Sequence, residues 1–176
     1  MEYVDLQLIP QFTKKVVCCF TGNRPYKLPW GEFETDLRCV AVKQKLREQI
    51  EKLISDGIFL FVCGMAQGAD IYFAEILFEL KEKYPHILIE GAIPYFDQAK
   101  SWDEKWRARY ENAMSKIDYK TVICDEPSRY APLKRNRYMV DKSSALISLN
   151  YDKSGGSAYT ERYATGKGIK IIKIIE

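Results

Sequence analysis

The sequence predicts an α/β fold in which a mostly parallel β-sheet carries helices on both faces. Two observations predict this fold. Short apolar runs alternate with longer stretches of helical periodicity along the whole chain, which is the pattern of repeated strand–helix–strand units. The chain has 176 residues, of which 47% are hydrophobic and 29% charged, so it is long enough for one domain with a sizeable core.

Apolar runs rich in β-branched and aromatic residues predict the strands. The runs KVVCCF and IFLFVC contain no alternation of polar residues, which is typical of strands that are buried on both faces. Glycine or proline directly follows several runs and marks the end of the strand. We expect strands over residues 15–20, 58–63, 87–93, 119–124, 145–149 and 169–175.

The stretches between these runs carry start and stop signals for helices. Asp36 is a candidate N-cap for the first helix, and Pro85 follows the second as a stop. We expect helices over residues 36–55, 68–83, 98–116 and 133–142, and from 157 to 166 or 168. Residues 1–13 are expected to form an irregular lead-in, and residues 14–176 a single domain of the Rossmann-like type.

Composition favours a protein of the cytoplasm. The number of cysteines is odd, with no C-x-x-C pair, which favours free buried thiols in a reducing compartment over disulfides or a zinc site. No signal peptide is apparent, and no apolar run approaches the roughly 20 residues of a membrane span. The net charge of +3 permits a phosphate-bearing partner without demanding one. The single histidine, His86, is expected in a surface turn, which makes Ser-His-Asp and Cys-His catalysis poor hypotheses.

The segments that follow the strands are the candidate site, because ligands of parallel α/β sheets bind at the carboxyl ends of the strands. The first strand is followed by TGNRP at residues 21–25. Glycine permits a sharp turn and a close approach of the backbone, and arginine suits a phosphate or carboxylate. The candidate ligand-binding residues here are Thr21, Gly22, Asn23 and Arg24. The alternative is a tight loop with a solvated arginine.

The second strand is followed by GMAQGAD at residues 64–70. This turn matches neither the dinucleotide fingerprint nor the P-loop, but a glycine-rich turn into a helix presents amides to an anion. In one interpretation Asp70 accepts a hydrogen bond from a ribose hydroxyl. In the other, its negative charge stabilises the start of the helix. The candidates here are Gly64, Gln67, Gly68 and Asp70.

The fifth strand is followed by SGGSAYTE at residues 154–161, a second glycine-rich turn into a helix. Two such turns in one alternating chain favour an anionic ligand. Glu161 is a candidate general acid or base beside the phosphate, together with Asp70, or it is a glutamate favoured by the helix dipole. The ligand-binding candidates here are Gly155, Gly156, Ser157 and Thr160.

The segment after the third strand offers aromatic residues and an amide. Trp102 could stack on a base and Gln98 could bond it, but an aromatic stripe at helical spacing is more often part of the core.

These motifs, taken together and in this order, resemble the SLOG superfamily. The segment RNR at 135–137, followed by an apolar strand and GSAYTER at 156–162, resembles the nucleotide-binding core of the DNA-processing protein family Smf/DprA. Residues 61–70 resemble that family's glycine-rich strand-turn-helix, and TGNRP resembles the opening motif of the YpsA-like branch of the superfamily. The resemblance spans residues 14–175 and adds Asn136 and Arg137 to the ligand-binding candidates.

The resemblance implies a Rossmann-like domain that binds a nucleotide or a nucleotide sugar such as ADP-ribose. The superfamily also contains the LOG phosphoribohydrolases, whose P-G-G-x-G-T-x-x-E motif supplies a glutamate for hydrolysis. Here the second glycine pair is missing and Glu161 falls out of step with that motif.

Three functions therefore remain as hypotheses. The first is a sensor or regulatory domain for a nucleotide or nucleoside phosphate, with no further cofactor and no metal. The second is a hydrolase of nucleoside monophosphates. The third is a single-stranded nucleic-acid-binding module, contacting its ligand through Arg24, Lys134, Arg135 and Arg137. Nucleic acid is the less favoured partner, no membrane partner is expected, and exposed apolar helix faces would permit a homodimer.

Overall fold

The computed structural model describes residues 12–175 and shows the predicted α/β Rossmann-like fold. Within this part of the chain the six strands form one sheet, and every pairing is parallel. The strands are β1 (Val17–Gly22), β2 (Leu60–Cys63), β3 (Leu88–Ile93), β4 (Tyr119–Val122), β5 (Ala145–Leu149) and β6 (Lys170–Lys173). The predicted lead-in, residues 1–13, lies almost entirely outside the described residues. Among the helices of residues 12–175, none is long and apolar enough to cross a membrane.

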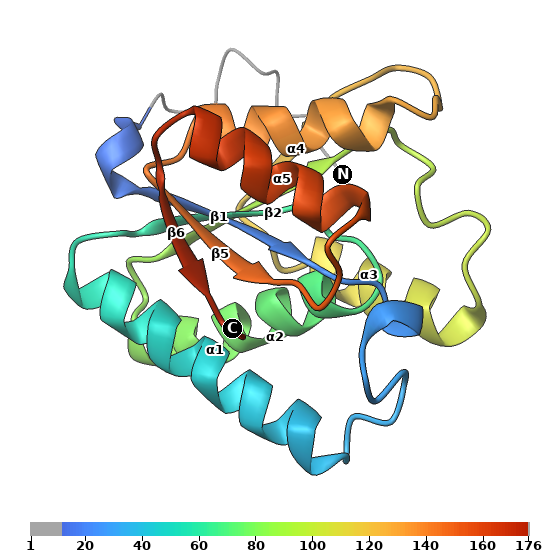
Figure 1. Cartoon of the computed structure of the whole chain (residues 1–176), viewed down its shortest axis with the longest axis horizontal. Helices are drawn as coiled ribbons and strands as arrows, with labels where there is room; N and C mark the ends of the chain where they lie inside the picture. Colours follow the sequence, from blue (N-terminus) through green and yellow to red (C-terminus); the bar gives the residue numbers. More distant parts are fainter. Residues whose placement is uncertain (1–11, 176) are drawn as a thin grey trace.

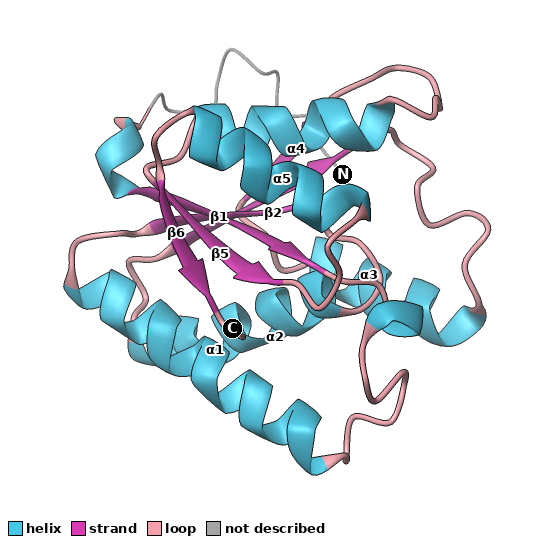
Figure 2. Ribbon diagram, in the orientation of Figure 1, coloured by secondary structure: helices cyan, strands magenta, loops and turns pink. Residues whose placement is uncertain are grey.

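Helices cover both faces of the sheet, as Figures 1 and 2 show. Helices α1, α2 and α3 lie on one face, and α4 and α5 lie on the other (Figure 1). The larger apolar core forms on the first face and a smaller one on the second. The helices are α1 (Leu37–Ser55), α2 (Ala69–Lys83), α3 (Glu104–Met114), α4 (Ala131–Asp141) and α5 (Gly155–Gly166), with the 3-10 turns η2 (Lys14–Val16) and η3 (Pro25–Lys27).

The strand order β4-β3-β2-β1-β5-β6 reverses between β1 and β5. The chain adds β2, β3 and β4 on one side of β1, and then returns to add β5 and β6 on the other side. The connections that leave β1 and β5 therefore diverge toward opposite faces of the sheet. The divergence leaves a crevice at their carboxyl ends, which is where ligands of such sheets bind.

Two element boundaries differ clearly from the sequence prediction. Strand β1 continues through Thr21 and Gly22, predicted as loop, because these residues pair in register with Ser148 and Leu149 of β5. Helix α3 begins at Glu104 rather than at residue 98, because the Asp103 side chain caps it by accepting a hydrogen bond from the Trp106 amide at 3.0 Å.

Asp36 caps α1 as predicted and makes part of its stability depend on pH. Its carboxylate accepts a hydrogen bond from the Arg38 amide at 2.8 Å and pairs with the Arg38 guanidinium. These contacts lower the pKa of Asp36 from 3.8 to about 2. A carboxylate with a lowered pKa stabilises the fold fully above its unfolded pKa, and this stabilisation is lost as the pH falls through the folded pKa.

We therefore expect Asp36→Ala to be less stable than the wild type at neutral pH, and the difference to shrink as the pH falls from about 4 to about 2. Urea unfolding of both proteins across this range measures the difference. Asp125→Ala, which removes an exposed carboxylate outside the helices and strands, is the control for general charge effects. A stability difference that stays constant on acidification would contradict the assignment.

Candidate functional site

A cavity of about 190 Å³ opens at the carboxyl ends of β1 and β5, at the point where the strand order reverses. Its walls come from five segments, of which the first two are consecutive and the others are distant from them in sequence. They are the end of β1, the loop that follows it, the turn from β2 into α2, helix α4, and the first turn of α5. The three glycine-rich segments found in the sequence thus meet at one cavity.

The first turn of α5 presents free donors to this cavity. Gly156 and Ser157 line it, and no described residue accepts a hydrogen bond from their amides. The preceding residue Ser154 does not cap the helix with its side chain, which instead bonds Asp152 at 3.1 Å. Unpaired amides at the positive end of a helix dipole favour an anion.

Asn136 of α4 faces the same place with a fixed orientation. The Arg135 Nε donates to Asn136 Oδ1 at 2.7 Å, which leaves Asn136 Nδ2 as the atom nearest to Gly156. An arginine nitrogen can only donate, so this contact decides which end of the amide faces the cavity. The Asn136 residue is 6% exposed, and its Nδ2 donates to no described residue. The amide is therefore a buried donor available to a ligand.

Arg135 is itself buried and holds the floor of the site. Its Nη1 donates to the carbonyl oxygen of Gly64 at 2.5 Å and that of Ala92 at 3.5 Å. Burial lowers the pKa of the Arg135 guanidinium, although nearby Asp70 acts in the opposite direction. A Cβ at Gly64 would collide with this guanidinium, so glycine is required there for packing.

Asp70 forms a second polar wall of the cavity. It lies in the first turn of α2, is 5% exposed, and accepts one hydrogen bond, from the Ala66 amide at 3.1 Å. No salt bridge joins Asp70 to a described cation. Burial raises the pKa of its carboxyl, while Arg135 and the Ala66 amide act against that rise.

The loop after β1 supplies the cations at the mouth of the cavity. The Arg24 side chain forms no hydrogen bond or salt bridge with a described residue, and its guanidinium lies 6.0 Å from the centre of the Trp102 ring. Lys27 also lines the cavity, but its Nζ pairs with Asp152 at 2.6 Å. Arg24 is therefore the cation at the mouth that remains free to pair with a ligand.

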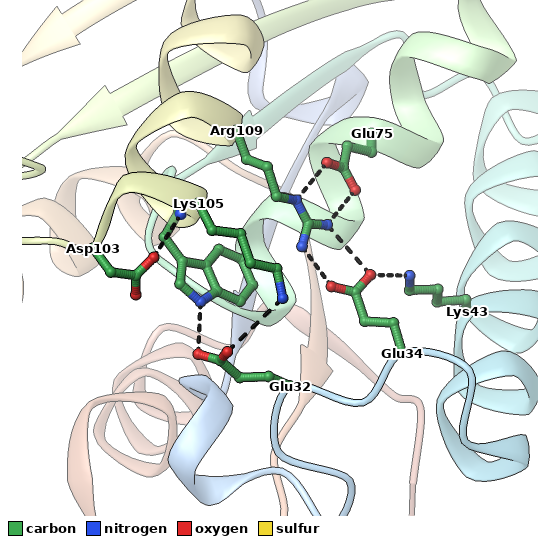
Figure 3. A network of polar contacts seen from close by, with 8 residues as sticks. Glu32, Glu34, Lys43, Glu75, Asp103, Lys105 and Arg109 are labelled. Atoms are coloured by element: carbon green, nitrogen blue, oxygen red, sulfur yellow. Dashed lines mark hydrogen bonds and ion pairs between the residues drawn. The ribbon is translucent and has the colours of Figure 1, made fainter.

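A network of charged residues fixes the far end of this loop, as Figure 3 shows. Arg109 of α3 pairs with Glu34 of the loop at 2.5 Å and with Glu75 of α2 at 2.7 Å. Lys43 of α1 also pairs with Glu34, at 2.6 Å. Because α3 and α1 both hold Glu34, and Glu75 of α2 in turn holds Arg109, the loop that carries Arg24 has a defined course over the molecule.

Comparison with known proteins shows the family of the chain. The sequence matches the model of the YpsA family, described as the "YspA SLOG family", over residues 18–170.

The chain belongs to the YpsA SLOG family. Among its relatives is a UPF0398 protein of Bacillus pumilus (strain SAFR-032), 28% identical over 144 residues, which are 80% of this chain and 76% of the relative. UPF0398 protein YpsA of Bacillus subtilis (strain 168) is 27% identical over 149 residues, or 81% of each chain.

Two solved structures with the same fold are DNA processing proteins. DprA from Streptococcus pneumoniae superposes with a TM-score of 0.58 at 13% identity, over 92% of this chain and 50% of that one. DprA from Helicobacter pylori, whose single-stranded DNA binding mode has been described, superposes with a TM-score of 0.59 at 18% identity. The superposition covers 91% of this chain and 65% of that one. This YpsA-family chain thus spans half to two-thirds of each DprA chain, and the likeness shows a shared fold.

Only part of the predicted set of site residues lines the cavity of this YpsA-family chain. Those that do come from all the predicted segments: Thr21, Gly22, Asn23, Arg24, Asp70, Asn136, Gly156 and Ser157. Those that do not are Gly64, Gln67, Gly68, Arg137, Gly155 and Thr160. Gly64 and Gly68 support the site from behind, since Gly64 packs on Arg135 and Gly68 adopts a positive φ next to the Asn23 carbonyl.

Several polar side chains predicted to face a ligand are used within the fold. Asn23 Oδ1 accepts from the Tyr151 amide at 2.6 Å, and its Nδ2 donates to Asn150 at 3.1 Å. Gln98 donates to the carbonyl oxygens of Gly64 and Met65. Thr160 donates to the Gly156 carbonyl at 2.8 Å. These contacts shape the loops around the cavity.

The remaining candidates lie elsewhere. Glu161 does not line the cavity, and it accepts a hydrogen bond from Ser148 at 2.6 Å. Arg137 is exposed on α4, where it bonds the hydroxyl of Tyr159 and lies over its ring. Trp102 packs edge to face against Tyr110, in agreement with the core interpretation of the aromatic stripe.

Sequence reasoning missed the residues that the 3-10 turn and α4 bring to the cavity. Tyr26 and Lys27 lie in η3, which begins at Pro25 and turns the loop back over the strand ends. Arg135 was expected only as a contact to nucleic acid, whereas it is buried and lines the cavity. The Pro25 turn was a usable signal for Tyr26 and Lys27, but nothing local to Arg135 indicates its burial.

Proposed function

We propose that this chain binds a phosphate-bearing nucleotide or nucleotide-derived ligand in the cavity at the reversal point of the sheet, as a sensor or regulatory domain. One observation carries the proposal: the free Nδ2 of the buried Asn136 amide lies beside Gly156, in the first turn of α5, where the backbone amides of Gly156 and Ser157 are unpaired. Three neutral donors and a helix dipole suit a phosphate, and Arg24 adds a charge-assisted contact at the mouth.

Membership of the SLOG family and the shared fold with DprA proteins support a nucleotide or nucleic acid as the class of ligand. A mononucleotide fits the site better than a long strand. The donors line a recess at the strand ends, and Arg135, one of the expected nucleic-acid contacts, is buried in its floor. Nucleic-acid binding instead depends on many exposed cations along the path of the strand.

The geometry favours binding over hydrolysis of a glycosidic bond. Glu161, the glutamate closest in sequence to the α5 cradle, bonds Ser148 and lies outside the cavity lining. Of the two candidate catalytic carboxylates, Asp70 alone lines the cavity. The site therefore lacks the α5 glutamate that glycosidic hydrolysis would use, and we assign Asp70 to binding.

Calorimetric titration with AMP, ADP-ribose, adenosine and a single-stranded oligonucleotide tests the proposal. We expect saturable binding of AMP or ADP-ribose and at least about tenfold weaker binding of adenosine, because adenosine lacks the group that the donors bind. Oligonucleotide binding that weakens steeply with salt, with no mononucleotide binding, would replace this function by that of a nucleic-acid module. Equal affinity for AMP and adenosine would show that the phosphate group does not contribute to binding, which contradicts the proposal.

A further inference from the structure

Asp70 presents a free acceptor to the cavity. Its Oδ2 accepts from the Ala66 amide at 3.1 Å, and its Oδ1 accepts from no described residue. The carboxylate is nine-tenths buried and lines the cavity, so the free oxygen faces a space that a ligand would fill. A buried acceptor that stays unpaired when a ligand displaces its water costs about 1–3 kcal/mol, or more for a charged group.

The neighbouring cation does not satisfy this oxygen. Arg135 lies beside Asp70, since both side chains would touch a Cβ placed on Gly64. The Arg135 nitrogens, however, donate to the carbonyl oxygen of Gly64 and to Asn136, and no salt bridge forms between Arg135 and Asp70 within the described chain. A ligand that places a hydrogen-bond donor at this position therefore gives Asp70 Oδ1 the partner that it lacks in the fold.

The size of the cavity limits which part of a nucleotide enters. Its volume is about 190 Å³, whereas pockets that enclose a whole small ligand measure roughly 300–1,000 Å³. A phosphate and the sugar attached to it suit the smaller space. Tyr26 lies at the cavity with 80% of its surface exposed, which leaves a flat aromatic face outside for a base.

Resting on the proposed function, we infer that the cavity takes the pentose phosphate end of a ribonucleotide and that Asp70 accepts a hydrogen bond from a ribose hydroxyl. The phosphate lies on the donors of α5 and Asn136, and the hydroxyl-bearing edge of the sugar faces α2. The site therefore selects ribonucleotides over deoxyribonucleotides and tolerates different bases. The selection comes from the acceptor at Asp70 and requires no chemical step.

Titration of the full chain with AMP, 2′-deoxy-AMP, 3′-deoxy-AMP, ribose 5-phosphate and inorganic phosphate tests the inference. We expect the loss of the bonded hydroxyl to weaken binding about 10- to 100-fold, and ribose 5-phosphate to bind more tightly than inorganic phosphate. The Asp70→Ala variant should bind AMP and its deoxy analogue with about equal affinity. Its affinity for inorganic phosphate should be retained or increased, because a nearby negative charge is removed. Asp70→Asn, which keeps an acceptor for the Ala66 amide, should fold like the wild type and show an intermediate preference.

The outcomes separate this inference from the proposed function. Equal binding of AMP and both deoxy analogues by the wild type would overturn the role of Asp70 while leaving the phosphate site intact. A preference that survives unchanged in both Asp70 variants would also overturn it. If no probe binds in a phosphate-dependent manner, the proposed function fails and this inference fails with it.

Discussion

Replacement of Asn136 with aspartate is expected to weaken AMP binding at least about 100-fold without lowering the stability of the fold. Aspartate has the same shape, so one carboxylate oxygen retains the contact from Arg135 Nε, now as an ion pair. The other oxygen takes the place of Nδ2 beside Gly156. A donor to the phosphate is thereby exchanged for a negative charge, which repels the phosphate within the buried cavity.

Arg137→Gln is the matched control, because Arg137 is the next residue of α4 and faces away from the cavity toward Tyr159. We expect it to bind AMP as the wild type does. Calorimetry gives the two affinities, and thermal unfolding shows whether each variant is folded. An Asn136→Asp protein that binds AMP with wild-type affinity would show that α4 does not contact the phosphate.

Replacement of Gly22 with alanine is expected to lower the free energy of unfolding by about 3 kcal/mol. Strand β1 and helix α2 approach each other so closely here that a Cβ on Gly22 would overlap the Cβ of Ala69 and lie 2.9 Å from the Phe20 ring. Both neighbours are fully buried and cannot move without disturbing the core. For a domain of this length, the melting temperature should fall by about 6–12 °C.

Gly156→Ala is the control for this prediction, because its Cβ would meet nothing closer than Asn136 Nδ2 at 3.9 Å. We expect its stability to equal or slightly exceed that of the wild type, since alanine favours the helix. Its new methyl group would occupy the phosphate position and weaken binding. Urea unfolding compares the two variants, and similar stabilities for both would contradict the tight packing assigned to Gly22.

The sequence was sufficient for the fold because the local signals agreed with one another. The range 145–149 predicted from the apolar run ALISL is the observed strand β5, and the Asp36 cap fixed the start of α1. The end of β1 was missed because Gly22 and Thr21 look like a turn locally. Only their pairing with Leu149 and Ser148, more than a hundred residues away, makes them strand.

The candidate site was predictable to the level of loops, but only in part to the level of side chains. The glycine-rich turns after β1, β2 and β5 do meet at one cavity, because parallel strands end at the same edge. Which polar group faces the cavity depends on long-range contacts that no local pattern encodes. Asn23 bonds Tyr151 and Asn150, whereas Asn136 has its oxygen held by Arg135 and keeps its nitrogen free.

A crystal structure of this chain with AMP at saturating concentration tests the central claim most directly. The account predicts phosphate oxygens within hydrogen-bond distance of Asn136 Nδ2 and of the Gly156 and Ser157 amides. A phosphate bound on another surface, or a cavity that holds only water while AMP is in excess, would contradict it.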